Sequence, residues 1–158
     1  MLIKLMPEQV TEYWDTIYPY IDKSLPPITH KDDYRGNDIL EDILINNMQC
    51  WIISNGDSFE NIDGVLTTSI TRENIAKLRY LLIYTIFAVD VLNRRVWIDI
   101  YRTLRKYAKG VGCSRLSFYT NVPGLVNLTK DVRFADQSTF VVLDLSATEK
   151  ELQLIGGD

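Results

Sequence analysis

The amino-acid sequence predicts an α/β domain in which helices cover both faces of a mixed sheet, and three features carry this prediction. Residues 78–89 are apolar at odd and at even positions, which indicates a central strand that is buried on both faces. A helical pattern over 94–109 and a strand-like run over 114–120 follow it, so a crossover helix is expected to connect two parallel strands. Two further helical patterns before residue 47 provide a second helical layer.

The N-terminal part of the chain predicts one short strand and two helices. Residues 2–5 are expected to form an edge strand, and Pro7 begins a helix, since proline is favoured in a first helical turn. A second helix is expected from about Asp38, with the Asp38 side chain as its N-cap, and it ends near Asn46. The positions expected to face inward are Val10, Trp14, Ile17 and Ile21 in the first helix and Ile39, Ile43 and Leu44 in the second.

The remaining elements complete one predicted domain over residues 1–145. Residues 48–54 and 64–71 are β-rich runs, and the Asn-Gly and Asp-Gly pairs between them favour a hairpin. The helix over 94–109 is expected to end at two glycines. A shorter helix over 121–134, a last strand over 138–145 and a tail over 146–158 follow.

Composition excludes several classes of protein. The net charge of −4 argues against a dedicated nucleic-acid binder, which usually has a basic balance. Cys50 and Cys113 lie far apart and His30 is the only histidine, so neither a disulfide framework nor a zinc site is expected. The longest apolar run is far shorter than the ~20 residues that a membrane span needs. We therefore expect a soluble, cytoplasmic protein without a metal ion or membrane contact.

The predicted order of elements resembles that of the GCN5-related N-acetyltransferase (GNAT) family. In that family the central strand ends in a Val-rich segment, and an Arg/Gln-x-x-Gly-x-Gly/Ala turn follows it. Val89 matches the strand end and Arg94 matches the first position of the turn. The resemblance implies acetyl-coenzyme A as cofactor, with its pyrophosphate held by backbone amides at the helix N-terminus. In an active member, the residues expected to bind it are Val89, Val91, Arg94, Arg95 and Asn121.

The chain departs from the family motif at the positions that approach the phosphates. The two glycine positions are occupied by Trp97 and Asp99. Glycine is used where backbone must come close to a phosphate, so the Trp97 side chain would fill that space. The Asp99 carboxylate would repel a pyrophosphate. Further along, Thr129 replaces the family's tyrosine general acid and Arg133 replaces a glycine, which leaves no catalytic residue assigned.

Glu73, near the start of the central strand, could act as a carboxylate base, but its setting in the sequence "TRENIAK" favours a solvated turn.

The helix over 94–109 is strongly amphipathic on a helical wheel. Trp97 lies near the middle of the apolar stripe, which favours a core residue over a ligand contact. The opposite face is basic, and we expect either an ordinary solvated surface or a docking surface for an acidic protein partner. It has no interleaved aromatic residues, which disfavours nucleic acid. The residues that define this basic face are Arg95, Arg102, Lys106 and Lys109.

Two functions follow from the sequence. The first is a non-catalytic binding or structural protein with the GNAT fold, which binds a protein partner or itself. It is similar to small acetyltransferase-like proteins of tailed phages, some of them associated with virions, which implies a location in the cytoplasm or in the virion. The alternative is an active N-acyltransferase that transfers an acetyl group from acetyl-coenzyme A to an amine. Trp97 and Asp99 are the residues that discriminate between them.

Overall fold

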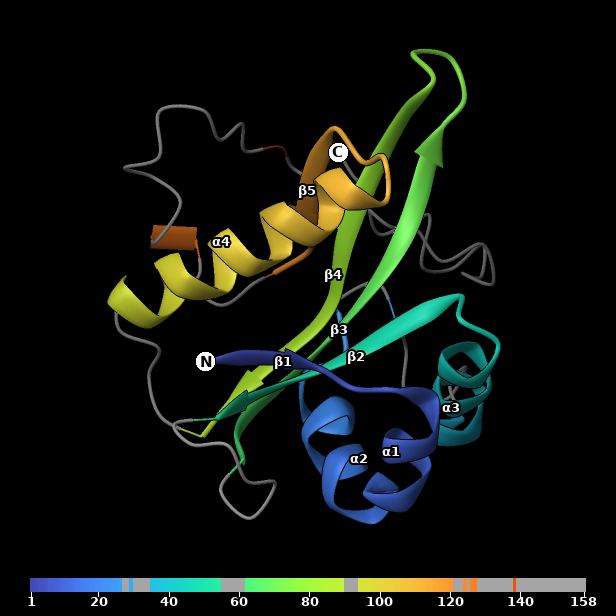
Figure 1. The fold of residues 1–158 in the computed structure, drawn as a ribbon, viewed down its shortest axis with the longest axis vertical. Coiled ribbons are helices and arrows are strands. Elements are labelled where there is room, and N and C mark those ends of the chain that lie inside the picture. The colour runs from blue at the N-terminus through green and yellow to red at the C-terminus, as the bar shows by residue number, and fades with distance from the viewer. Residues whose placement is uncertain are drawn as a thin grey trace, which may run out of the picture.

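The computed structural model describes residues 1–26, 29, 35–54, 62–89, 94–120, 124, 126, 127 and 138. These residues form a five-stranded mixed sheet in which the strands follow their order in the chain (Figure 1). Neighbouring strands are antiparallel except for the last pair, β4 and β5, which is parallel as predicted. The strands are β1 (Leu2–Lys4), β2 (Met48–Ser54), β3 (Ile62–Glu73), β4 (Leu78–Ala88) and β5 (Arg115–Phe118).

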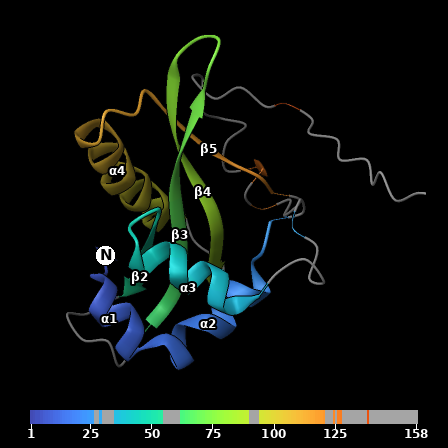
Figure 2. The same ribbon diagram turned by 90° about the vertical axis from the view of Figure 1, so that its right-hand side faces the viewer.

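Helices cover both faces of this sheet, which confirms the predicted architecture (Figure 2). On one face, α1 (Pro7–Glu12), α2 (Trp14–Lys23) and α3 (Gly36–Leu44) pack against β2, β3 and β4. On the other face lies α4 (Arg94–Gly110). We call these two groups the α1–α3 layer and the α4 layer. The sheet therefore separates two apolar clusters, one beneath each layer.

The α1–α3 layer differs from its prediction in three details. A single helix was expected to begin at Pro7, but the chain forms α1 and α2, which meet at Tyr13. Asp38 is not the N-cap of α3: it lies in the first turn and accepts a hydrogen bond from the backbone N–H of Arg35 at 3.2 Å. Leu44 is 43% exposed rather than buried. Ile39 and Ile43 are four residues apart and both face the sheet. Leu44 follows Ile43 and is rotated about 100° around the helix axis, so its side chain points away from the sheet.

The inward positions of this layer are otherwise confirmed. The side chains of Val10, Ile17, Ile21, Ile39 and Ile43 are buried in the same apolar cluster, and Trp14 packs against that cluster while half-buried. The helical spacing of apolar residues therefore predicted the buried side of each helix, even where a helix boundary was wrong.

The α4 layer is built from one long amphipathic helix. Trp97, Ile100, Leu104 and Ala108 are buried against the sheet, with spacings of three and four residues. The helix ends at the predicted glycines, and Gly112 has a φ of +77°, a backbone conformation that glycine adopts without steric cost. The apolar stripe of the sequence is thus confirmed as the core-facing side of α4.

Buried polar side chains connect neighbouring strands of the sheet. The Trp51 indole N–H donates to the Thr68 hydroxyl at 3.0 Å, and that hydroxyl donates to the Gln49 side-chain carbonyl at 3.0 Å. The hydroxyls of Thr67 and Thr85 also share a hydrogen bond at 2.8 Å. Each of these buried groups has a partner, so the chain of hydrogen bonds contributes to the register of β2, β3 and β4.

Several predictions fall outside the described residues. They are most of the helix over 121–134, of which residues 124, 126 and 127 are described and helical, the strand over 138–145 apart from residue 138, the tail over 146–158 and the domain boundary at residue 145. Among the residues that the structure describes, no helix is long and apolar enough to cross a membrane.

Candidate functional site

The central strand β4 has an irregularity at Tyr84. Along β3, Thr67 pairs with Thr85 while its neighbour Thr68 pairs with Ile83, so Tyr84 is an extra residue in β4. Such a β-bulge bends the strand and breaks its ladder of hydrogen bonds locally. The bulge was not predicted, because a strand that is apolar on both sides shows no alternation whose interruption would reveal a register shift.

β4 and β5 part beside this bulge. Their parallel pairing runs from Tyr80 opposite Arg115 to Ile83 opposite Phe118. β5 ends there, whereas β4 continues to Ala88. The C-terminal half of β4 therefore has β3 on one side and no described strand on the other. This opening beside the central strand is the candidate site.

Trp97 lies where the two strands part. It belongs to the first turn of α4, is 8% exposed, and its ring meets that of Phe118 edge to face, with the ring centroids 6.2 Å apart. Phe118 is the last residue of β5 that pairs with β4. The Trp97 side chain thus packs into the core at the end of the opening nearest to β5, which confirms its interpretation as a core residue.

Aromatic side chains line the other face of the same stretch of β4. The Tyr84 hydroxyl shares a hydrogen bond with the Thr29 hydroxyl at 2.8 Å. Phe87 packs against Tyr20, with ring centroids 5.2 Å apart, and the Lys23 ammonium lies 5.8 Å from the centre of the Phe87 ring. Within β4 and β5 there is no Asp, Glu or His, so neither strand supplies a general base.

Glu73 and the two cysteines are held in a turn or buried, which does not favour acid–base or nucleophilic chemistry at these three residues. The Glu73 carboxylate accepts hydrogen bonds from the backbone N–H groups of Ile75 and Ala76, so it caps the β3–β4 turn. Burial raises the pKa of the Cys50 thiol to about 12 and also raises the pKa of Cys113, which keeps both thiols neutral at pH 7. The described residues contain no group of His, Cys, Asp and Glu arranged to hold a metal ion.

Three of the predicted coenzyme-binding residues lie within the described part of the chain. Val89 follows the end of β4, is 58% exposed, and donates its backbone N–H to the Asp63 carbonyl at 2.8 Å. Arg94 and Arg95 begin α4 and are exposed. Val91 and Asn121 lie outside the described residues, as does the whole turn over 90–93. Coenzyme binding by any of the five stays a prediction.

The first two turns of α4 are charged on their exposed side. Asp99 forms an ion pair with Arg102 at 3.2 Å, and both side chains are largely exposed. The predicted basic face is confirmed as a solvent-facing surface, because Arg95, Arg102, Lys106 and Lys109 are all exposed. Whether this surface binds a partner stays a prediction.

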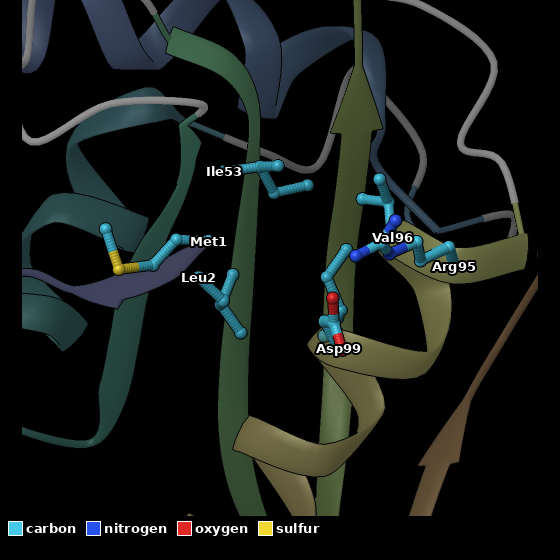
Figure 3. A pocket seen from close by; sticks show the side chains of 7 residues that line it. Met1, Leu2, Ile53, Arg95, Val96 and Asp99 are labelled. Atoms are coloured by element: carbon cyan, nitrogen blue, oxygen red, sulfur yellow. The ribbon is translucent and has the colours of Figure 1, made fainter.

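A hollow beside the first turns of α4 lies away from the opening between β4 and β5 (Figure 3). It has a volume of about 210 Å³, which is below the ~300–1,000 Å³ typical of ligand pockets. It lies toward β1 and β2 at the opposite edge of the sheet. The hollow is therefore small for a ligand pocket. Its walls are Met1, Leu2 and Ile53 on one side and Arg95, Val96, Asp99 and Ile100 on the other.

Sequence comparison finds no relatives for this chain: no protein-family model matches it, and no curated protein matches it. Structural comparison gives a different result, because solved acetyltransferases match nearly the whole chain.

Three of these structures illustrate the different kinds of acetyltransferase that match. A glucosamine-6-phosphate N-acetyltransferase from Arabidopsis thaliana has a TM-score of 0.60 and 11% identity, with 92% of this chain and 97% of that chain covered. A ribosomal-protein-alanine N-acetyltransferase from Brucella melitensis biovar Abortus 2308 has a TM-score of 0.59 and 17% identity, with coverage of 91% and 99%. An aminoglycoside acetyltransferase from an uncultured soil metagenomic sample, in complex with sisomicin, has a TM-score of 0.65 and 7% identity, with coverage of 94% and 96%.

At these identities the likeness concerns the fold. The three similar structures are named for a sugar phosphate, a ribosomal protein and an aminoglycoside, so the shared fold accommodates very different acceptors. The match covers the mixed sheet of five strands and the helices that pack on it. This chain has the GNAT acyl-CoA N-acyltransferase fold.

Proposed function

We propose that this chain is a non-catalytic binding or structural protein that has the GNAT fold without a working coenzyme A cradle. The observation that carries the proposal is the position of Trp97. In the GNAT arrangement acyl-coenzyme A lies beside the central strand, and glycine in the first turn of the following helix lets backbone amides reach the pyrophosphate. Here that turn contains a tryptophan packed against Phe118, at the point where β4 and β5 part.

Charge and acid–base chemistry support the same proposal. The Asp99 carboxylate, in the second turn of α4, would repel a phosphate bound at the start of the helix. An amine acceptor must lose a proton during acetyl transfer, and neither β4 nor β5 has a carboxylate or imidazole to accept it. An acetyltransferase of this sequence would have to rely on water or on residues outside these strands.

The alternative is an active N-acyltransferase, and the parting of the strands favours it. The bulge at Tyr84 and the early end of β5 leave an opening beside β4 like the one that the fold uses for acyl-coenzyme A. In the reaction an amine nitrogen attacks the thioester carbonyl carbon. The C–N bond forms, the C–S bond breaks, and coenzyme A leaves as a thiol with the proton that the amine loses.

Titration with acetyl-coenzyme A separates the two functions. A ligand at 100 times its dissociation constant adds about 2.7 kcal/mol of stability, which raises the melting temperature by several degrees. For a protein without a cradle we expect almost no change at millimolar acetyl-coenzyme A and no thiol release with added amines. A shift of several degrees that free coenzyme A competes away would contradict the proposal and favour the acyltransferase.

We further propose that the binding surface is the basic face of α4 and that it binds an acidic protein surface. Charged surfaces of opposite sign steer association and fix orientation. We also propose a location in the cytoplasm or, because of the resemblance to small phage proteins, in a phage particle. Mass spectrometry of purified particles and of the soluble lysate fraction tests it.

A further inference from the structure

The two helical layers carry opposite charge. Asp99 is the only acidic residue of α4, and it is already paired with Arg102. The exposed cations of α4 are Arg94, Arg95, Arg102, Arg105, Lys106 and Lys109.

The α1–α3 layer shows the reverse balance. Lys23 is the only basic residue within its three helices. Carboxylates occur along all three helices, and several are exposed to solvent, including those of Glu12 and Glu41. The carboxylates of the layer are Glu8, Glu12, Asp15, Asp22, Asp38, Glu41 and Asp42.

These layers lie on opposite faces of one sheet, so the charge separation spans the molecule (Figure 2). The net charge of −4 hides this asymmetry. A molecule with one basic and one acidic face attracts a second copy in a head-to-tail orientation, because the α4 layer of one copy then meets the α1–α3 layer of the next. Face-to-face contacts between like layers are repulsive.

Each charged surface also exposes apolar side chains that can form the dry centre of a contact. On α4, Ile98 is 37% exposed and lines an open concavity together with Arg94, Arg95, Asp99 and Arg102. In the α1–α3 layer Leu44 is exposed at the end of α3, and Met6 and Ile45 are each 58% exposed beside α1 and α3. Protein interfaces combine such an apolar centre with a charged rim.

We propose that the partner of the basic face of α4 is the α1–α3 layer of a second copy of this chain. This inference rests on the docking role proposed above for α4 and names its partner. The contact is heterologous, because different surfaces of the two copies meet, so a pair of copies keeps one free α4 layer and one free α1–α3 layer. Repetition of the contact gives a closed ring or an open row of molecules, and the assembly weakens as salt screens the charges.

Charge reversal on each face provides the test. Variant R102E/K106E makes the α4 surface acidic, and variant E12K/E41K makes the α1–α3 surface basic. All four side chains are exposed. A charge-matched control, R72E/K77E, changes exposed cations near the β3–β4 turn, outside both layers, and alters the net charge by the same amount as R102E/K106E.

Sedimentation velocity over a concentration series measures the association at about 0.01 M and about 1 M salt, where the Debye length is about 30 Å and about 3 Å. We expect the wild type and the R72E/K77E control to self-associate at low salt and to dissociate at high salt. Each layer variant alone should associate at least about tenfold more weakly than the wild type. An equimolar mixture of the two layer variants should associate again, because the native α1–α3 layer of R102E/K106E meets the native α4 of E12K/E41K.

Three results would overturn the inference: a wild type that stays monomeric at low salt, a layer variant that associates like the wild type, or a mixture that does not recover association. None of them bears on coenzyme binding, which the acetyl-coenzyme A titration decides separately. A monomeric wild type that ignores acetyl-coenzyme A would refute self-association and leave the non-catalytic proposal standing.

Discussion

The α1–α3 layer and the α4 layer cover the same sheet in different ways. Both bury apolar stripes of the kind that the sequence pattern predicts, and each has its own buried cluster. They differ in what lies at the end of β4: the α1–α3 layer packs the Tyr20 ring against Phe87 of β4, whereas α4 brings Trp97 to the place where β5 ends. The two layers therefore bring different aromatic side chains to the end of β4, while each keeps its own apolar cluster filled.

The largest expected effect is the loss of stability in Trp97→Ala. This variant tests whether Trp97 supports the core or only blocks a pocket. Trp97→Ala should lower the free energy of unfolding by about 3–5 kcal/mol, because truncation of a large buried aromatic leaves a cavity. Urea denaturation measures the loss. Trp14→Ala in the α1–α3 layer is the matched control and should cost less, since Trp14 is only half-buried. Near-normal stability of Trp97→Ala together with new affinity for acetyl-coenzyme A would show that Trp97 only blocks a pocket.

Ile17→Ala is a similar truncation of a buried side chain, beneath the α1–α3 layer instead of the α4 layer. Ile17 is fully buried in the cluster below α1–α3, so Ile17→Ala should cost about 2–5 kcal/mol. The response to acetyl-coenzyme A should not change, because Ile17 lies on the face of the sheet away from α4. The melting temperature with and without the coenzyme tests both points. A coenzyme response that appears in this variant would mean that stability, rather than the Trp97 side chain, controls binding.

Alkaline pH should weaken the protein through its buried thiols. Cys50 lies below α1–α3, and burial raises its pKa from 9.0 to about 12. The unfolded thiol ionises first, so the stability that the neutral thiol contributes is complete below pH 9 and is lost progressively toward pH 12, by up to about 1.4 kcal/mol per pH unit.

Cys50→Ala should therefore flatten the fall in unfolding free energy over this pH range. Cys113→Ala, beneath α4, should flatten it less, because the positive charge of Arg79 partly offsets the raised pKa of Cys113. Equal slopes for both variants and the wild type would show that the thiols do not cause the alkaline loss.

The smallest expected effect is that of surface charge on folding. R102E/K106E and E12K/E41K should each change the free energy of unfolding by no more than about 1 kcal/mol, because exposed ion pairs contribute little to stability. Urea denaturation at moderate salt checks this. A larger loss in either variant would mean that the reversed side chains support the fold, and conclusions about association would then need milder neutral substitutions.

Periodicity predicted most of the described fold. The spacing of Ile39 and Ile43, the stripe from Trp97 to Ala108 and the doubly apolar β4 all identified buried sides correctly, because burial of apolar area dominates folding. The break at Tyr13 and the exposure of Leu44 escaped prediction, since the local pattern does not fix where one helix ends.

Less of the candidate site than of the fold could be predicted from the sequence. The substitutions at Trp97 and Asp99 were visible in the motif, and the burial of Trp97 followed from the helical wheel. The bulge at Tyr84 and the end of β5 at Phe118 depend on pairing between distant strands, which no local pattern encodes. The contact between Trp97 and Phe118, which carries the proposed function, is therefore a result of tertiary structure alone.

A crystal structure of the protein grown with millimolar acetyl-coenzyme A is the most direct test of whether Trp97 leaves the protein without a coenzyme A cradle. We expect the Trp97 ring to stay packed edge to face on Phe118 and no coenzyme to lie along β4. Density for acetyl-coenzyme A beside Tyr84–Ala88, with its pyrophosphate at the start of α4 and Trp97 turned away from Phe118, would contradict it.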